Sequence, residues 1–201
     1  VVWDPPAGTV DVVLVAYLGF SGVDLDTVAD GGEEPVVDTA VPEAGPCPAD
    51  MVHIEGFCID RYEAYLVDQS PYDVPSGGVA ANAAGAVPQG YISGSVAAGA
   101  CEAAGKRLCS STEWVRACEG PEGNVYPYGD TYEAGTCNDR RSSHPVIDVF
   151  GSNAAWTGTQ MNSPLLNQLP DSLAAAGDYE GCVTAEGVHD MHGNLHEWVA
   201  D

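Results

Sequence analysis

Seven cysteines are the strongest constraint that this 201-residue chain places on its fold. No two of them form a CxxC pair, and their spacings do not resemble a zinc ribbon or finger. Disulfide bridges in an oxidising compartment explain them better, so we expect a secreted, periplasmic or cell-surface protein. Because the number is odd, one thiol is left free or has its partner outside this chain. The candidate bridge residues are Cys47, Cys58, Cys101, Cys109, Cys118, Cys137 and Cys182.

Local sequence predicts one of the bridges. The segment MVHIEGFCIDRYEAY (51–65) is typical of two short strands around the turn Glu55-Gly56. A bridge between Cys47 and Cys58 would then cross this hairpin. The pairing of the other cysteines stays open, because many connectivities are compatible with their spacing.

The charge of the chain excludes two classes of partner. Thirty Asp and Glu face six Lys and Arg, which gives a net charge of −24. Such a surface repels nucleic acid and anionic membranes, and it attracts cations, calcium above all. Solubility explains most of the charge, since an ion site uses only a few carboxylates. No segment reaches the roughly 20 apolar residues of a membrane span.

The chain divides into two parts of different composition. Residues 1–46 contain no Lys or Arg, and their acidic stretch 26–46, rich in Gly and Pro, indicates a leader or linker. Within this part, residues 10–20 could form one strand. Residues 47–201 form the expected folded domain. The chain starts at Val1 and ends just after an apparent strand, so we interpret it as a fragment or a processed product.

Two helices are the only helical signals that we identify. The first covers about 93–104, with a Ser cap and Gly105 as the residue after its end. The second covers about 111–119, where Ser110 and Glu113 have capping-box spacing. The remainder, dense in Gly, Pro and Asn, is expected to be ordered loop tied down by ions and disulfides.

Two stretches could hold a cation. In GVHDMHGNLHEWVAD (187–201), His192 and His196 have the spacing of a zinc helix, but Gly193-Asn194 between them breaks helices. A glycine-rich turn followed by Glu197 suits calcium better; the alternative is a tight turn leading into a core strand at Trp198. In TCNDRRSSHPVIDVFGS (136–152), oxygens could come from Asn138, Asp139 and Asp148, or these acids could instead pair with Arg140 and Arg141. No nucleophile elbow, phosphate loop or dinucleotide fingerprint is present, so no catalytic residue is assigned.

Several segments, taken in order, resemble one family. They are CPADMVHIEGFCIDRYE (47–63), CEAAGKRLCSSTEWVRACEG (101–120), YPYGD (126–130), CN (137–138) and GVHDMHGNLHEW (187–198). They look like the sulfatase-modifying-factor family, which includes the formylglycine-generating enzymes. The resemblance implies an α+β fold of the C-type-lectin-like, formylglycine-generating-enzyme type, with two short helices, short strands and much irregular loop.

The resemblance also implies structural calcium. The first ion would be held by the carbonyls of His192, Gly193 and Leu195 and by the side chain of Glu197. The second would be held by Asn138, the carbonyl of Asp139, Asp148 and Phe150. Copper is implied only for an intact parent protein, since none of the seven cysteines matches the catalytic pair of the family.

Two functions are compatible with these observations. The chain could be part of a formylglycine-generating-type oxidase that acts on a peptide cysteine, lacking in this chain the catalytic C-terminal part. It could instead be an extracellular, calcium-stabilised, lectin-like module that binds a protein or glycan. Whether the parent is an enzyme stays open at this point.

Overall fold

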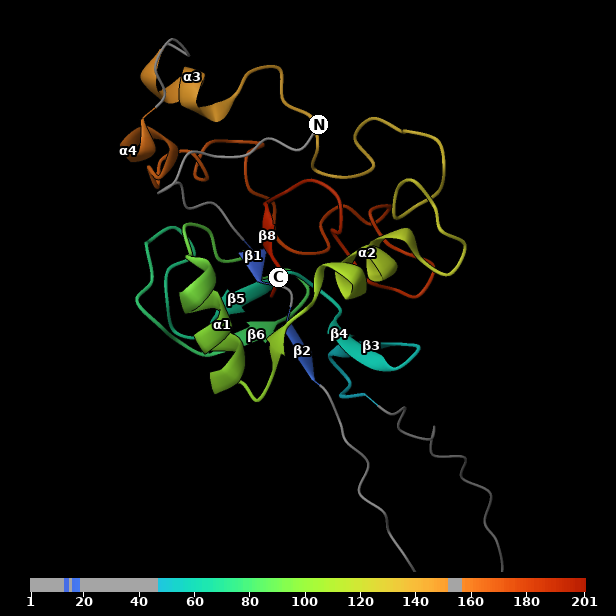
Figure 1. Ribbon diagram of the computed structural model, residues 1–201. Coiled ribbons are helices and arrows are strands. Elements are labelled where there is room, and N and C mark those ends of the chain that lie inside the picture. The colour runs from blue at the N-terminus through green and yellow to red at the C-terminus, as the bar shows by residue number, and fades with distance from the viewer. Residues whose placement is uncertain (1–12, 15, 19–46, 152–156) are drawn as a thin grey trace, which may run out of the picture.

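The computed structural model describes residues 13–14, 16–18, 47–151 and 157–201, and for residues 13–18 it describes the backbone alone. The expected linker 26–46 lies outside the described residues. Short elements alternate with long connecting loops throughout (Figure 1). Small helices and short, mostly antiparallel strands make this an α+β fold, as predicted.

The predicted hairpin is confirmed. Strands β3 (Met51–Ile54) and β4 (Phe57–Asp60) pair antiparallel, and Glu55 in the turn takes a left-handed φ of 50°. They belong to a four-stranded sheet of order β3-β4-β2-β7, with β2 at Ala16–Leu18 and β7 at Arg107–Leu108. The hairpin is therefore one edge of a sheet.

Two further pairs of strands complete the β-structure of the described residues. Strand β5 (Ala64–Leu66) pairs antiparallel with β6 (Ala80–Asn82), and β1 (Val13–Leu14) pairs in parallel with β8 (Glu197–Trp198). One strand was expected over 10–20, whereas β1 and β2 join different sheets. Residues 13–14 and 16–18 thus pair with strands of the 47–201 region.

Both predicted helices are confirmed with their caps. Helix α1 (Gly94–Ala103) begins after Ser93, whose side chain accepts from the Val96 N–H. The residue beyond its C-cap, Gly105, has a φ of +71°, which a residue with a Cβ adopts at a cost. Helix α2 (Ser111–Glu119) starts with a capping box. These ends form where the local sequence supplies the hydrogen-bond partners.

Two more helices correct the expectation of only two. Helix α3 (Pro145–Phe150) has Pro145 in its first turn, His144 as N-cap and left-handed Gly151 at its end. Helix α4 (Gly158–Met161) is a single turn with a capping box from Thr157 and Gln160. Each is too short to show a helical period, so only its capping residues could have predicted it.

The core consists of two clusters. One packs the Ala97 and Ala100 face of α1 against β5, β6 and β7, and small side chains let the helix come close to the strands. The partly buried Trp198 closes this cluster: its Nε1 donates to the Ile92 carbonyl at 3.0 Å. The other cluster joins the β3–β4 hairpin to α2 and to Met191. Both clusters therefore reach the 187–198 segment, which is held from two sides.

Candidate functional site

The closing stretch forms a turn with an unusual backbone. Asp190, Gly193 and Asn194 have φ values of 60°, 83° and 57°, the left-handed region that favours Gly and tolerates Asn and Asp. Gly193 faces the backbone of residue 138 so closely that a Cβ would lie 2.6 Å from the Asn138 carbonyl oxygen. The sequence therefore needs glycine at 193 for both conformation and space.

Asn194 joins this turn to its surroundings. Its N–H donates to the Asn138 carbonyl at 2.9 Å, and its Oδ1 accepts from Asn138 Nδ2 at 2.8 Å and from the Ala174 N–H at 3.0 Å. Its Nδ2 donates to the carboxylate of Glu63. Because the N–H and C=O of one trans peptide point in opposite directions, the Gly193 carbonyl points away from the Asn138 segment.

Three carboxyl groups are buried around this turn: Glu63, Asp190 and Glu197. Glu63 and Asp190 are 1% and 5% exposed. Burial, and then the charges of Glu197 and Asp190, hold the pKa of Glu63 well above its usual range. Burial likewise raises the pKa of Glu197 to about 8 and that of Asp190 to about 6. Mutual repulsion of buried acids favours either bound protons or a cation beside them.

Glu197 is anchored from helix α2. The indole Nε1 of Trp114 donates to its Oε2, and Trp114 is held in register by the capping box at Ser110. Glu63 keeps one buried carboxylate oxygen, Oε1, without a hydrogen-bond partner. A buried acceptor without a donor costs free energy. A proton or a cation beside Oε1 would remove that cost.

The first predicted calcium set is consistent with this geometry. Its carbonyl donors belong to His192, Gly193 and Leu195, and its carboxylate is that of Glu197. In the described part of the chain, no three His, Cys, Asp or Glu side chains converge to hold a metal. An ion at this turn would thus be bound mainly by backbone carbonyls, which calcium accepts readily.

The residues of the second predicted set make other contacts in this structure. The carboxylate of Asp148 lies 2.9 Å from Arg141 Nη2, and this contact holds its pKa below the usual range. Phe150, on α3, is 40% exposed. The side chain of Asn138 is occupied by Ser172, Asn194 and Tyr179. The alternative pairing of Asp148 with an arginine is therefore present in this structure, and the second calcium site stays a prediction.

The side chain of Asp139 contacts the turn rather than α3. Its Oδ2 lies 3.4 Å from His192 Nε2, while its Oδ1 is buried without a hydrogen-bond partner. His192 also packs edge-on against Tyr126. The imidazole of His192 therefore lies between Asp139 and Tyr126, where it connects the turn to the 137–139 segment.

The cysteines form two bridges, Cys47–Cys58 as predicted and Cys137–Cys182. Cys101, Cys109 and Cys118 are unbridged, whereas the sequence led us to expect most of them to pair. Burial raises the pKa of Cys101 to about 12 and that of Cys118 to about 11, and it raises the pKa of Cys109 further still. They behave as core residues and not as reactive thiolates.

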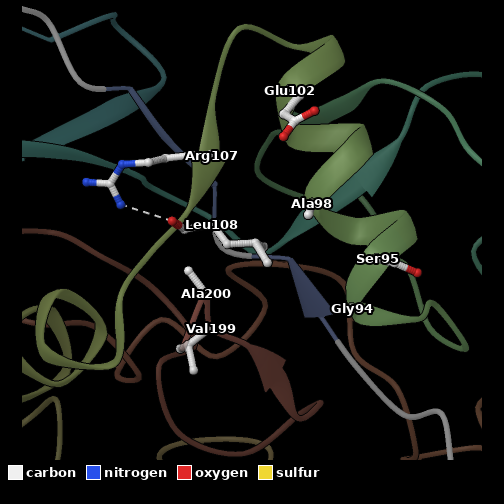
Figure 2. A pocket seen from close by; sticks show the side chains of 8 residues that line it. All are labelled: Gly94, Ser95, Ala98, Glu102, Arg107, Leu108, Val199 and Ala200. Atoms are coloured by element: carbon white, nitrogen blue, oxygen red, sulfur yellow. Dashed lines mark hydrogen bonds between the residues drawn. The ribbon is translucent and has the colours of Figure 1, made fainter.

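A separate cavity of about 450 Å³ lies between α1, β7 and the last residues. Figure 2 shows Leu108 and Ala200 facing its interior, while the Arg107 guanidinium turns back to the Leu108 carbonyl, at 3.0 Å. None of the turn residues lines it. Its small, mainly apolar lining offers little chemistry, so the candidate site is the turn.

Within the described residues, no helix has the length and apolar character needed to cross a bilayer.

Sequence reasoning missed Glu63, Asp190 and Trp114 as parts of the site. Glu63 and Trp114 lie within segments that carry the family resemblance, but their contacts with the turn span 131 and 83 residues. Nothing local in the sequence marks such contacts.

Comparison with known proteins gives one match. The family model of the sulfatase-modifying factor enzyme 1-like domain matches residues 25–201. A search of curated proteins found no match, and neither did a search of solved structures.

Proposed function

Because the chain belongs to the family of sulfatase-modifying factor enzyme 1-like domains, we propose that its turn at 192–197 binds one structural calcium ion in a lectin-like, extracytoplasmic domain. The observation that carries this proposal is the burial of Glu63, Asp190 and Glu197 around one turn. The charges of Glu197 and Asp190 act on Glu63 and, after burial, raise its pKa further. A bound cation would offset them.

Each residue of the turn would have its own role in binding the ion. Carbonyls of His192, Gly193 and Leu195 and the carboxylate of Glu197 would supply four oxygens of the six to eight that calcium takes, with water completing the set. Trp114 orients Glu197 through the indole N–H. The side-chain amide of Asn194 keeps the turn against Asn138 and Glu63. Binding needs Glu197 ionised, so calcium competes with its proton.

Calcium titration of chelator-treated protein tests this function. We expect saturable calorimetric binding of one ion and a rise in the unfolding temperature with calcium. Glu197→Gln should abolish both effects, whereas Glu122→Gln, which removes an equal charge at an exposed position, should leave them intact. Absence of any calcium-dependent heat or stabilisation in the unmodified chain would overturn the proposal.

For the intact protein, we infer from the family an oxidase activity on a peptide cysteine. Its copper would need two thiolates, and the cysteines of this chain do not fit: four are bridged, and the three others are held protonated by burial. Incubating the full-length gene product with copper, dioxygen and a cysteine peptide, and assaying the peptide for an aldehyde by mass spectrometry, tests this activity. A peptide that stays unmodified argues against it.

A binding module is the second candidate, and the held loops favour it. The Ser172 carbonyl accepts from Asn138 Nδ2 at 2.7 Å, and the Ala174 N–H donates to Asn194. These contacts hold residues 172–174 beside the turn, and the loop that precedes them exposes Leu165. If this segment binds a protein or glycan, removing calcium should abolish binding in a protein that shows no oxidase activity.

A further inference from the structure

Glu63 occupies the short link between β4 and β5, far from the turn in sequence but in contact with it. It is 1% exposed, and its Oε2 accepts from Asn194 Nδ2. The backbone amide of Leu195 also faces its carboxylate. Its other oxygen, Oε1, is buried and makes no hydrogen bond. A carboxylate in this position interacts with the amide side of the turn and not with its carbonyls.

This contact fixes the conformation of the turn. Asn194 holds a left-handed φ of 57°, a conformation that needs support from its surroundings in a residue with a side chain. Its side chain receives that support from Glu63 on one side and from Asn138 on the other. If either partner is lost, Asn194 can relax, and the carbonyls on both sides of it change direction.

The inference rests on the proposed calcium turn. We propose that Glu63 is the positioning residue of that turn: by holding the Asn194 side-chain amide, it aims the neighbouring Gly193 carbonyl at the ion, and in its ionised form it adds a negative charge beside the cation. It acts through Asn194 and the Leu195 N–H and is not itself a proposed ligand. Partners of this kind, which hold metal ligands in place, are worth about 10–100-fold in metal affinity.

Two variants separate positioning from a purely structural role. Glu63→Gln keeps the size of the side chain and one acceptor oxygen but removes the charge. Asn194→Gly keeps the positive φ available and removes the amide. Calcium titration of each full chain should show affinity about 10–100-fold lower than that of the unmodified chain. Because both changes act on the same contact, the double variant should lose much less than the product of the two losses.

Terbium supplies a spectroscopic readout that overall stability does not move. The Trp114 indole touches Glu197, so terbium bound at the turn should show tryptophan-sensitised emission. A loosened turn should admit more water to the ion and shorten its luminescence lifetime in both variants. Glu122→Gln is the matched charge control and should behave like the unmodified chain. Near-ultraviolet circular dichroism establishes that each variant is folded.

The outcomes are distinguishable. Calcium binding by the unmodified chain, weakened in both variants and coupled in the double variant, supports the role of Glu63. Unchanged affinity in Glu63→Gln overturns it and leaves the calcium proposal standing; if that variant does not fold, unchanged affinity in Asn194→Gly does the same. An unmodified chain that binds no calcium overturns the proposed function and this inference together.

Discussion

Gly193 lies directly against Asn138, with space for a hydrogen but not for a methyl group. A Cβ at 193 would stand 2.6 Å from the Asn138 carbonyl oxygen and 2.8 Å from its carbon, both backbone atoms that cannot move aside as a flexible side chain can. The same two segments are joined by the Asn194 N–H and by the side chain of Asn138. The bridged 137 loop and the 190–194 turn therefore behave as one unit.

Gly193→Ala should destabilise the protein by about 3 kcal/mol. A left-handed alanine costs about 1–2 kcal/mol, and the overlap adds about 1–3 kcal/mol. Urea unfolding at fixed calcium measures the free energy. Gly85→Ala is the control, since Gly85 has a similar φ of +75° but open space around its Cβ position; it should cost only the conformational part, about 1–2 kcal/mol. If both variants lose the same free energy of unfolding, the close approach of Gly193 to Asn138 does not contribute to stability.

The cap of helix α2 gives a second prediction. Ser110 Oγ accepts from the Glu113 N–H, and Glu113 Oε2 accepts from the Ser110 N–H at 2.9 Å. Ser110→Ala should cost about 1 kcal/mol, and Ser110→Gly only a few tenths. Because α2 carries Trp114, the alanine variant should also weaken calcium binding through Glu197. An alanine variant as stable as the glycine variant would contradict the cap.

Acid should remove a contribution from Glu113. Hydrogen bonds from Arg107, the largest cause, lower the pKa of Glu113 to about 2 from its ordinary value of 4.5. The ionised carboxyl therefore stabilises the fold above pH 4.5, and this contribution is lost as the pH falls through 2. Glu113→Gln should reduce the change of the unfolding free energy with pH between pH 4.5 and about 2. The exposed Glu122→Gln should keep the original slope; if both variants lose it, the pairing with Arg107 is not responsible.

Local signals explain what the sequence could predict. The caps at Ser93 and Ser110 and the Glu55-Gly56 turn act within a few residues, and the structure has the helices and hairpin that they predict. The bridge between Cys47 and Cys58 follows from the same hairpin. Helices α3 and α4 were missed because their only signals are Pro145 after a cap and one Thr-x-x-Gln box.

Long-range contacts explain what the sequence could not predict. The burial of Glu63 beside Asn194 depends on a contact across 131 residues. The resemblance implied a second ion set that includes Asp148, whereas in the fold Arg141, seven residues before Asp148, pairs with that carboxylate. A guanidinium within reach satisfies the acid without any ion, and only the folded geometry shows that it does so.

The bridge between Cys137 and Cys182 should matter more than the hairpin bridge. It closes a loop of 45 residues against 11 for Cys47–Cys58, so chain entropy assigns it about 4 kcal/mol against about 3. It also fixes the segment that holds Asn138. The double variant C137S/C182S should lose calcium affinity as well as stability, whereas C47S/C58S should lose stability alone. Calorimetric titration and urea unfolding of both variants measure these losses.

The thiol count supplies the last prediction. Cys101 and Cys109 are fully buried, and Cys118 is partly buried with a pKa raised to about 11. A short pulse of iodoacetamide on the native protein should therefore modify Cys118 slowly and the other two scarcely at all. In denaturant without reductant, intact-mass spectrometry should show three modified cysteines, and with reductant all seven. A single modified cysteine in denaturant would instead indicate three bridges, which is what the odd number of cysteines first suggests, and the third bridge would join two of Cys101, Cys109 and Cys118.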